Sequence, residues 1–218
     1  MAVALITHEA CLHHDPGQGH PERIDRLRAV LAALTEARFP ELVREQAPRA
    51  TAEQLRSVHH APYVERLLGM EVSLGGHQAL DPDTVLSHGS VEAALRAAGA
   101  AVHAVDMVMD GRANAAFAAV RPPGHHAEPG RAMGFCLFNN VAVAAQHARR
   151  SWGVKRVAVA DFDVHHGNGT QAAFWTDPSL AFASSHQSPC YPGTGARHEC
   201  GAEGQIANAP LAPGAGSA

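Results

Sequence analysis

Residues 157–170 read VAVADFDVHHGNGT, and this stretch decides the fold. The run from Lys155 to Ala160 is short and rich in small and β-branched side chains, which predicts a central parallel strand buried on both faces. Asp161, Asp163 and His165 follow where that strand should end. Side chains two residues apart on an extended backbone share a face. The sequence therefore predicts a polar site at the carboxyl edge of an α/β sheet, where such folds bind ligands.

Asp163 and His165 would offer one carboxylate and one imidazole to a divalent cation, a donor set that suits zinc or iron better than magnesium or calcium. The alternative is a polar loop without chemistry, in which Asp163 caps a turn and His165 is solvated. His125 and His126 favour the metal site, because they follow a second apolar run at 115–120. Adjacent histidines thus follow two predicted strands, at the points where each strand passes into a loop. Packing alone does not explain this pattern.

The flanking sequence alternates strand-like and helix-like segments. Thr51 and Gln54 form the pattern of a capping box, and Ser90 is the expected N-cap of a long alanine-rich helix. Residues 75–89 are expected to form a long loop, and residues 187–218 are rich in turns. The pattern predicts a single-domain α/β fold with a largely parallel sheet flanked by helices. Strands are expected at 2–7, 41–45, 114–120, 155–160 and 180–184, and helices at 21–34, 51–58, 62–68, 90–110, 140–150 and 171–175.

The composition narrows the class of protein. A chain of 218 residues has room for one domain with a substantial core, and its formal net charge of -4 gives no basic surface for nucleic acid or for a membrane. Neither a signal peptide nor an apolar run near the roughly 18 residues of a membrane span is present in the sequence. A cytoplasmic protein is expected. The four cysteines lack CxxC spacing, so free thiols are expected.

Four ordered segments resemble a known family. They are RPPGHHA (121–127), GFCLFNN (134–140), DFDVHHGNGTQ (161–171) and YPGTG (191–195), and they are similar to the successive signature segments of the zinc-dependent histone deacetylase and acetylpolyamine amidohydrolase superfamily. HDPGQGHPERIDRL (14–27) resembles the amino-terminal segment of its bacterial, class II-like members. The resemblance implies an arginase/deacetylase-like fold, of which residues 1–218 would be the N-terminal portion.

The resemblance also implies an activity. It points to a zinc-dependent hydrolase that removes acetyl or related acyl groups from acetylated lysine or from polyamine-type amines. Asp163 and His165 are implied as ligands to one zinc per active site, with Fe2+ as an alternative metal. His125 and His126 are implied as the proton acceptor and donor beside the metal-bound water. A bound zinc lowers the pKa of its water toward about 7 and polarises a carbonyl, as amide hydrolysis requires.

The partners of the two histidines follow from the same resemblance. Asp161 is implied to hold His125, and Asn168 to hold His126. An aspartate raises the pKa of an imidazole, whereas an amide orients the ring without adding charge, so the two histidines are predicted to differ in basicity. Asp161 and Ser184 also match a family site in which backbone carbonyls hold a monovalent cation, so K+ is a second expected ion.

The remaining implied positions line the path of the substrate. Phe135 and Tyr191, with Gly134 beside them, match the aromatic walls of the tunnel that holds the acyl-amine stem. Arg23 is implied near the floor of the active site. An acetylated amine or acetyl-lysine is the expected substrate partner, and neither nucleic acid nor a membrane is expected. The sequence leaves open the choice between protein, polyamine and other acylated amines, and the oligomeric state.

Two residues of the family pattern are missing from the sequence given. The family has a further aspartate ligand and a tyrosine that stabilises the tetrahedral intermediate, and residues 196–218 contain neither aspartate nor tyrosine. The expectation is therefore a fold that lacks its C-terminal part. The second interpretation is a truncated, non-catalytic remnant of the family that binds metal weakly or acts only as an interaction partner.

Overall fold

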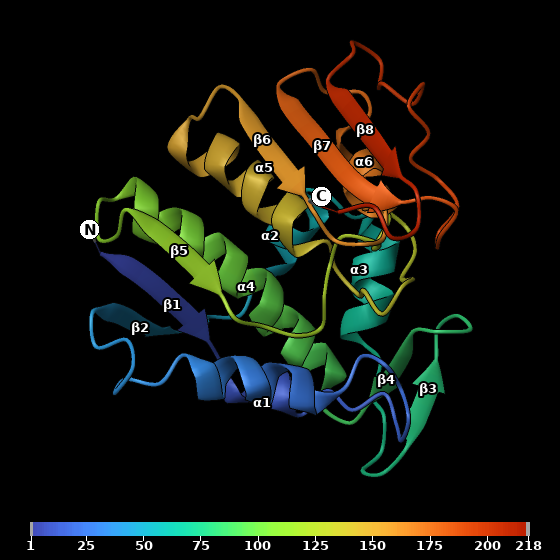
Figure 1. The fold of residues 1–218 in the computed structure, drawn as a ribbon. Coiled ribbons are helices and arrows are strands. Elements are labelled where there is room, and N and C mark those ends of the chain that lie inside the picture. Colours follow the sequence, from blue (N-terminus) through green and yellow to red (C-terminus); the bar gives the residue numbers. More distant parts are fainter. Residues whose placement is uncertain (1, 217–218) are drawn as a thin grey trace.

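The computed structural model describes residues 2–216, and its frame is a pair of three-stranded parallel sheets (Figure 1). The strand order is β2-β1-β5 in the first sheet and β6-β7-β8 in the second. The α/β class and the parallel direction of the strands are confirmed. The strands are β1 (Val3–Thr7), β2 (Leu42–Gln46), β5 (Ala115–Ala118), β6 (Val157–Asp161), β7 (Leu180–Gln187) and β8 (Ile206–Leu211).

Two long helices join the sheets. α4 (Ser90–Met109) packs on β1 and β5, α5 (Asn140–Trp152) contacts β6, and the two helices pack against each other (Figure 1). Within residues 2–216 no helix combines the length and apolar character needed to cross a bilayer. The shorter helices are η1 (Glu9–Leu12), α1 (Ile24–Ala33), α2 (Ala52–Arg56), α3 (Ala61–Leu68) and α6 (Asn168–Phe174).

The small residues of α4 allow close packing against the chain beside it. Ala93, Ala97 and Ala98 are fully buried. At Gly99 an added Cβ would lie only 2.0 Å from the carbonyl oxygen of Pro48, so this position has no room for a side chain. The alanine-rich pattern therefore reflects the backbone distance that the helix keeps from its neighbours.

The two predicted N-caps have different outcomes. The capping box is confirmed: the Gln54 amide donates to Thr51 Oγ1 at 3.1 Å, and the Thr51 amide donates to Gln54 Oε1 at 2.8 Å. The prediction for Ser90 is wrong by one residue. Gly89 is the N-cap of α4, with φ of 89°, a left-handed conformation that glycine adopts readily. The Ser90 hydroxyl is buried instead and accepts the Ser87 amide at 2.7 Å.

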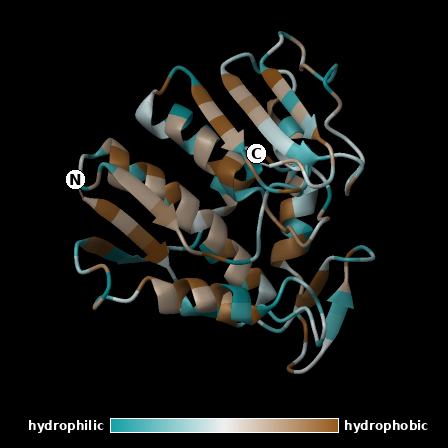
Figure 2. Ribbon diagram, in the orientation of Figure 1, coloured by the Kyte–Doolittle hydropathy of each residue, from teal (hydrophilic) through white to brown (hydrophobic). Residues whose placement is uncertain are grey.

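Two segments predicted as irregular contain strands. The stretch 75–89 carries an antiparallel pair, β3 (His77–Ala79) and β4 (Val85–Ser87), and β3 is exposed and hydrophilic (Figure 2). No apolar alternation marks such a strand. The second is β8, which contains Pro210. Proline is tolerated at a sheet edge because the missing N–H interrupts no ladder there, and within residues 2–216 β8 is an edge strand.

The predicted burial of the strand before Asp161 on both faces is wrong. β6 alternates half-buried and exposed residues, and within residues 2–216 it pairs only with β7. In the same range β5 pairs only with β1, and Figure 1 shows β5 and β6 as the facing outer strands of the two sheets, separated by a gap. Apolar side chains are exposed along these edges: Phe117 is 50% and Phe162 is 89% exposed. A hollow of about 620 Å³ lies there, lined by Val141, Val159 and Phe162 among others.

His59 is a buried neutral histidine that joins α2 and α3 to the loops of the site. It is 2% exposed, its Nδ1–H donates to the Glu128 carbonyl at 3.0 Å, and its Nε2 accepts the Asn139 amide at 2.9 Å. Burial lowers the pKa of His59 from 6.5 to about 4. Protonation of Nε2 would break the bond from Asn139, so the folded state opposes it.

We expect this histidine to make folding acid-sensitive. The unfolded chain binds the His59 proton near pH 6.5, whereas the folded chain binds it only near pH 4, so stability falls as the pH drops through this window. The loss for one such group is about 3 kcal/mol. Urea unfolding at pH 7 and pH 4.5 would measure it. His59→Gln should be less stable at pH 7 but lose less on acidification, and an equal loss in the two proteins would contradict the prediction.

Candidate active site

Two adjacent imidazoles form the centre of the site, on the loop that follows β5. The His125 Nδ1–H donates to Asp161 Oδ2 at 2.9 Å, and the His126 Nδ1–H donates to Asn168 Oδ1 at 2.8 Å. Both predicted pairs are present in the structure. Their ring centroids are 4.0 Å apart. Because each Nδ1 carries the proton that its partner accepts, the Nε2 atom of each neutral ring is left to accept a proton.

Glycines on either side of Asn168 allow this arrangement. An added Cβ at Gly167 would lie 2.3 Å from Asp161 Oδ2, and one at Gly169 would lie 2.3 Å from the Ala127 carbonyl oxygen. The start of α6 thus approaches the histidine loop backbone to backbone. The sequence GNG at 167–169 is explained by this contact.

A residue that the sequence analysis missed fixes the Asn168 amide. The Asn168 Nδ2–H donates to Glu128 Oε1 at 2.9 Å, so Oδ1 is the atom turned to His126. Burial lowers the pKa of His126 to about 4, and the charge of neighbouring His125 acts in the same direction. His126 is therefore neutral near pH 7, as a proton acceptor must be.

Asp163 and His165 are brought together by consecutive turns. Asp161 Oδ1 accepts the Asp163 amide at 3.1 Å, and Asp163 Oδ1 accepts the His165 amide at 2.8 Å. The His165 Nδ1 atom lies 3.2 Å from the same Asp163 oxygen. The predicted convergence is observed, but it comes from side-chain-to-backbone turns, because β6 already ends at Asp161.

The charge of Asp161 is also stabilised here. Burial alone would raise the pKa of this carboxyl, but the hydrogen bond and the charge of His125 outweigh it and hold the pKa below its usual range. An ionised Asp161 can stabilise a positive charge on the His125 ring.

Asp163 and His165 together offer zinc part of its usual set of ligands. A carboxylate and an imidazole in contact fit two of its usual ligands, and catalytic zinc usually has three from the protein. In the described range, 2–216, no group of three or more His, Cys, Asp or Glu side chains is arranged to hold a metal. Asp163 and His165 thus fit as part of a zinc site.

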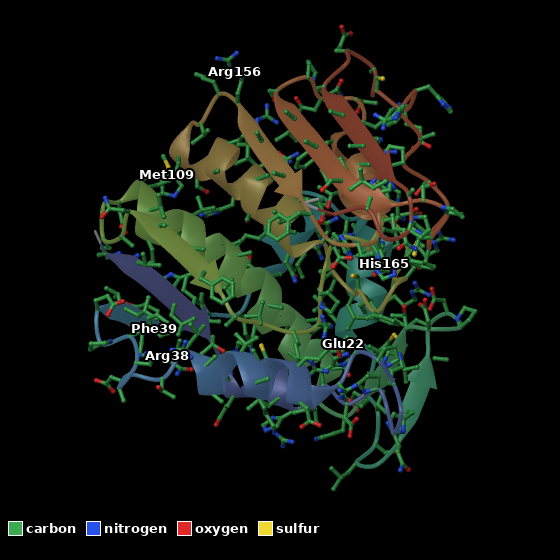
Figure 3. All side chains as sticks on the ribbon, in the orientation of Figure 1. Glu22, Arg38, Phe39, Met109, Arg156 and His165 are labelled. Carbon is green, nitrogen blue, oxygen red and sulfur yellow. The ribbon has the colours of Figure 1, made fainter. Side chains whose placement is uncertain are left out.

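The side chains of His125, His126, Asp163 and His165 all line one cavity of about 500 Å³. Figure 3 shows His165 on the side of the molecule toward which the strands point. Gly134, Phe135 and Tyr191 line the cavity, as predicted. The Tyr191 ring stands edge-on to that of His126, with centroids 5.0 Å apart. Burial raises the pKa of the Tyr191 phenol, so this wall is uncharged near pH 7.

The turn that presents Phe135 is conformationally unusual. Gly134 has φ of 57° and Phe135 has φ of 68°, a region that residues with a side chain rarely adopt. An added Cβ at Gly134 would lie 2.4 Å from His126 Cδ2. Only glycine at this position lets the wall lie directly against the imidazole.

The structure does not bring Arg23 to the site. Arg23 is an exposed residue that precedes α1, and Arg26, one turn further along that helix, lines the cavity instead. Ser184 is the cross-strand partner of Asp161 in the β6–β7 register, so these two predicted positions are neighbours. The other lining residues are Pro21, Asp83, Pro123 and Val164.

This fold, with its paired imidazoles beside an Asp-x-His turn, is that of the histone deacetylase domain. The chain belongs to that family, whose domain matches residues 20–218. Its members among the similar proteins are deacetylases and deacetylase-like amidohydrolases.

Two relatives and one solved structure illustrate the similarity. The chain is 40% identical to a probable deacetylase of Archaeoglobus fulgidus over 99% of its own length and 61% of the relative's. It is 42% identical to a histone deacetylase-like amidohydrolase of Pseudomonas aeruginosa over 90% of its own length and 52% of the relative's. The crystal structure of the HDA15 HD domain superposes with a TM-score of 0.88 at 38% identity, covering 96% of this chain and 61% of the other. The chain thus spans about half to three fifths of the length of these relatives.

Gly134→Ala should displace His126. The new methyl group would occupy space now held by the ring, so we expect the His126–Asn168 hydrogen bond to break in a crystal structure of the variant. Gly153→Ala is the matched control, because Gly153 also has a positive φ (68°) but no atom within 4 Å of the new Cβ. Both variants should lose about 1–2 kcal/mol of stability from the backbone conformation. An undisturbed His126 in Gly134→Ala would contradict this account.

Proposed function

We propose that the protein containing this chain is a zinc-dependent amidohydrolase that removes acetyl or related acyl groups from amines. The observation that carries the proposal is the pair of Nδ1-anchored imidazoles, His125 and His126, beside the Asp163–His165 turn in one cavity. Family membership supports the reaction type.

Each side chain at the site would have its own role in hydrolysis. Asp163 and His165 would hold the zinc, which supplies an activated water and polarises the substrate carbonyl when bound. His126, kept neutral by burial, accepts a proton at Nε2. His125, backed by the Asp161 carboxylate, is suited to carry a proton and donate it to the departing amine.

The cavity walls favour a substrate with an extended, apolar stem. Phe135 and Tyr191 both line the 500 Å³ cavity, and two aromatic rings can hold a methylene chain between them. Acetyl-lysine and acetylated polyamines both have such a stem. For a second ion we propose K+ near Asp161 and Ser184, supported by their adjacency across β6 and β7.

His126→Ala should lower turnover of an acetyl-lysine peptide by about 10²–10⁴-fold, the usual contribution of a positioned acid or base. The assay uses the natural polypeptide that contains residues 1–218, loaded with zinc. His147→Ala is the control, because His147 also pairs with a carboxylate, Asp106, but lies between α4 and α5 away from the cavity. Equal activity in wild type and His126→Ala, on acetyl-lysine and on acetylated polyamines, would refute the proposal.

A non-catalytic protein that binds metal weakly is the second candidate. The observation that favours it is that residues 2–216 supply two neighbouring ligands and no cluster of three. The zinc content of the purified protein distinguishes the two candidate functions. We expect an amidohydrolase to retain zinc and a weak metal binder to lose it.

We expect the natural polypeptide to retain one zinc per chain and Asp163→Ala to lose it. Each lost ligand or ligand support weakens metal binding by at least about 10–100-fold. Asp177→Ala serves as the control, since Asp177 pairs with Arg149 at 2.5 Å away from the cavity. Metal analysis after dialysis measures both. Absence of zinc from the wild type would favour the second candidate, and zinc retained by Asp163→Ala would move the site elsewhere.

A further inference from the structure

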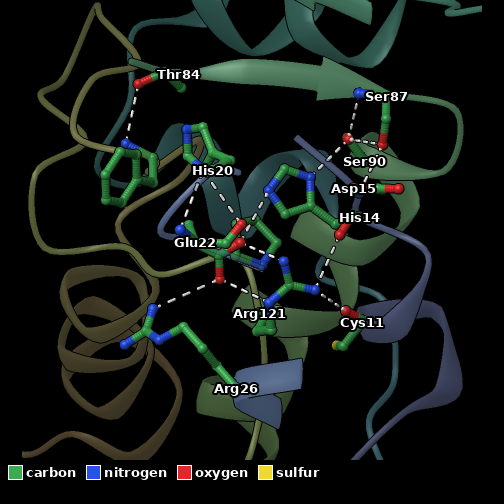
Figure 4. Close-up of polar contacts among 12 residues, drawn as sticks. Cys11, His14, Asp15, His20, Glu22, Arg26, Thr84, Ser87, Ser90 and Arg121 are labelled. Atoms are coloured by element: carbon green, nitrogen blue, oxygen red, sulfur yellow. Dashed lines mark hydrogen bonds and ion pairs between the residues drawn. The ribbon is translucent and has the colours of Figure 1, made fainter. Parts of the chain in front are cut away.

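A buried ion pair lies beneath the site, between α1 and the start of the histidine loop (Figure 4). The Glu22 side chain is 0% exposed and that of Arg121 is 4% exposed. The guanidinium binds both carboxylate oxygens: Nε donates to Oε1 at 2.7 Å, and Nη2 donates to Oε2. Two-point pairing of this kind fixes the orientation of both side chains.

The pair also holds the preceding chain. Arg121 Nη1 donates to the carbonyl oxygens of Cys11 at 2.9 Å and His14 at 3.0 Å. The His14 ring is 3.6 Å from Glu22 Oε2, and burial lowers its pKa to about 3, so it is neutral. Arg26 Nη1 lies 3.8 Å from Glu22 Oε1. Glu22 is thus the one acid among these side chains. It lies against Arg121, His14 and Arg26, which come from the histidine loop, the chain before Glu22 and α1.

Arg121 is the link to the catalytic histidines. It stands four residues before His125, and the residues between are Pro122, Pro123 and Gly124. Two prolines restrict the backbone, so the position of Arg121 is transmitted to His125 and His126 with little freedom. Gly124 itself is packed closely, because an added Cβ there would lie 2.6 Å from the Asn140 amide nitrogen.

A second branch leads from Glu22 to the aromatic wall. The backbone N–H of Glu22, which the buried carboxylate holds in place, donates to His20 Nδ1 at 3.1 Å, and the His20 Nε2–H donates to the Asp83 carbonyl at 3.1 Å. The His20 ring then stands against that of Phe135, with centroids 4.8 Å apart. The Phe135 amide donates to Thr84 Oγ1 at 3.0 Å, which holds the unusual backbone of this turn.

We propose that Glu22 is a positioning residue that sets two walls of the site from one buried point, the imidazole pair through Arg121 and the Phe135 turn through His20. Its effect on turnover rests on the proposed hydrolysis, whereas its effect on the two loops does not. A residue with only a structural role would lower stability and leave the loops and the rate of the folded protein unchanged.

The test compares Glu22→Gln with Glu92→Gln in the zinc-loaded natural polypeptide. Glu92 is a matched control: it binds Arg49 at 2.6 Å and Arg96 at 2.8 Å, and Arg96 also donates to a carbonyl, that of Ala47, at 2.7 Å. It does not line the cavity. Amide hydrogen exchange measures how firmly the two loops are held. The kcat and KM for an acetyl-lysine peptide measure how well the site works.

We expect Glu22→Gln to speed amide exchange in residues 121–127 and 133–138 and to lower kcat by about 10–100-fold, the size typical of groups that orient catalytic ligands. KM should rise as well, because the displaced Phe135 is a proposed wall for the substrate stem. Glu92→Gln should change none of these. Adding Arg121→Lys to Glu22→Gln should lower kcat by less than the product of the two single effects, because both changes remove the two-point contact. Unchanged exchange in both segments, or a kcat equal to that of Glu92→Gln, would overturn the proposal.

The single variant Arg121→Lys still tests the proposal if the Glu22→Gln protein does not fold. Lysine keeps the charge but loses the two-point contact and the bonds to the Cys11 and His14 carbonyls. It should give the same exchange pattern in a folded protein, and a wild-type pattern would refute the inference. An inactive wild type would refute the proposed function alone, since the exchange result still decides whether Glu22 positions the loops.

Discussion

Two hydrogen bonds from imidazole to oxygen hold the active-site loops together. They cross between the two sheets, because His125 and His126 follow β5 of the first sheet, while Asp161 and Asn168 come at and after the end of β6 in the second. Within residues 2–216 no backbone ladder joins β5 to β6. The Thr170 amide adds one link, to the His125 carbonyl at 3.1 Å. The relative position of the four side chains therefore depends on side-chain contacts as much as on the sheets.

A buried polar network around His166 lies next to this arrangement. His166 is buried, with Nδ1 at 2.8 Å from Thr194 Oγ1 and Nε2 at 3.0 Å from Gln171 Oε1. Gln171 in turn donates to Glu199 at 2.6 Å. Among the described residues Asn208 Oδ1 is the one buried side-chain oxygen or nitrogen without a partner. Asn208 belongs to this network, because its Nδ2–H donates to Gln171 Oε1 at 2.7 Å, so all but one of the buried polar atoms are paired and the network favours one geometry beside the candidate site.

The sequence was informative where local chemistry determines the structure. The Thr51 capping box and the positions of most helices and strands followed from motif and periodicity, and the two histidine pairs followed from the family resemblance. The predictions were wrong where distant parts of the chain decide. Arg23 and Arg26 are three residues apart, and the cavity that Arg26 lines is built by distant residues such as Asp83 and Tyr191, which the local sequence does not reveal.

The same reason explains the other omissions. Glu22 and Arg121 are 99 residues apart, and no spacing rule predicts that they bind each other. The exposure of β6 depends on which strands are present beside it, which its own apolar residues do not reveal. β8 was missed because Pro210 argues against a strand unless the strand is known to be at an edge.

The division of the strands into two sheets bears on how the chain assembles during synthesis. All pairings of the first sheet close within residues 3–118, and all pairings of the second within residues 157–211. The first sheet and α4 can therefore form before the second sheet has left the ribosome, since folding proceeds from the N-terminus in units. α5 then docks on α4 and brings the second unit into place. The candidate site draws residues from both units, so among the described residues it is complete only after both have folded.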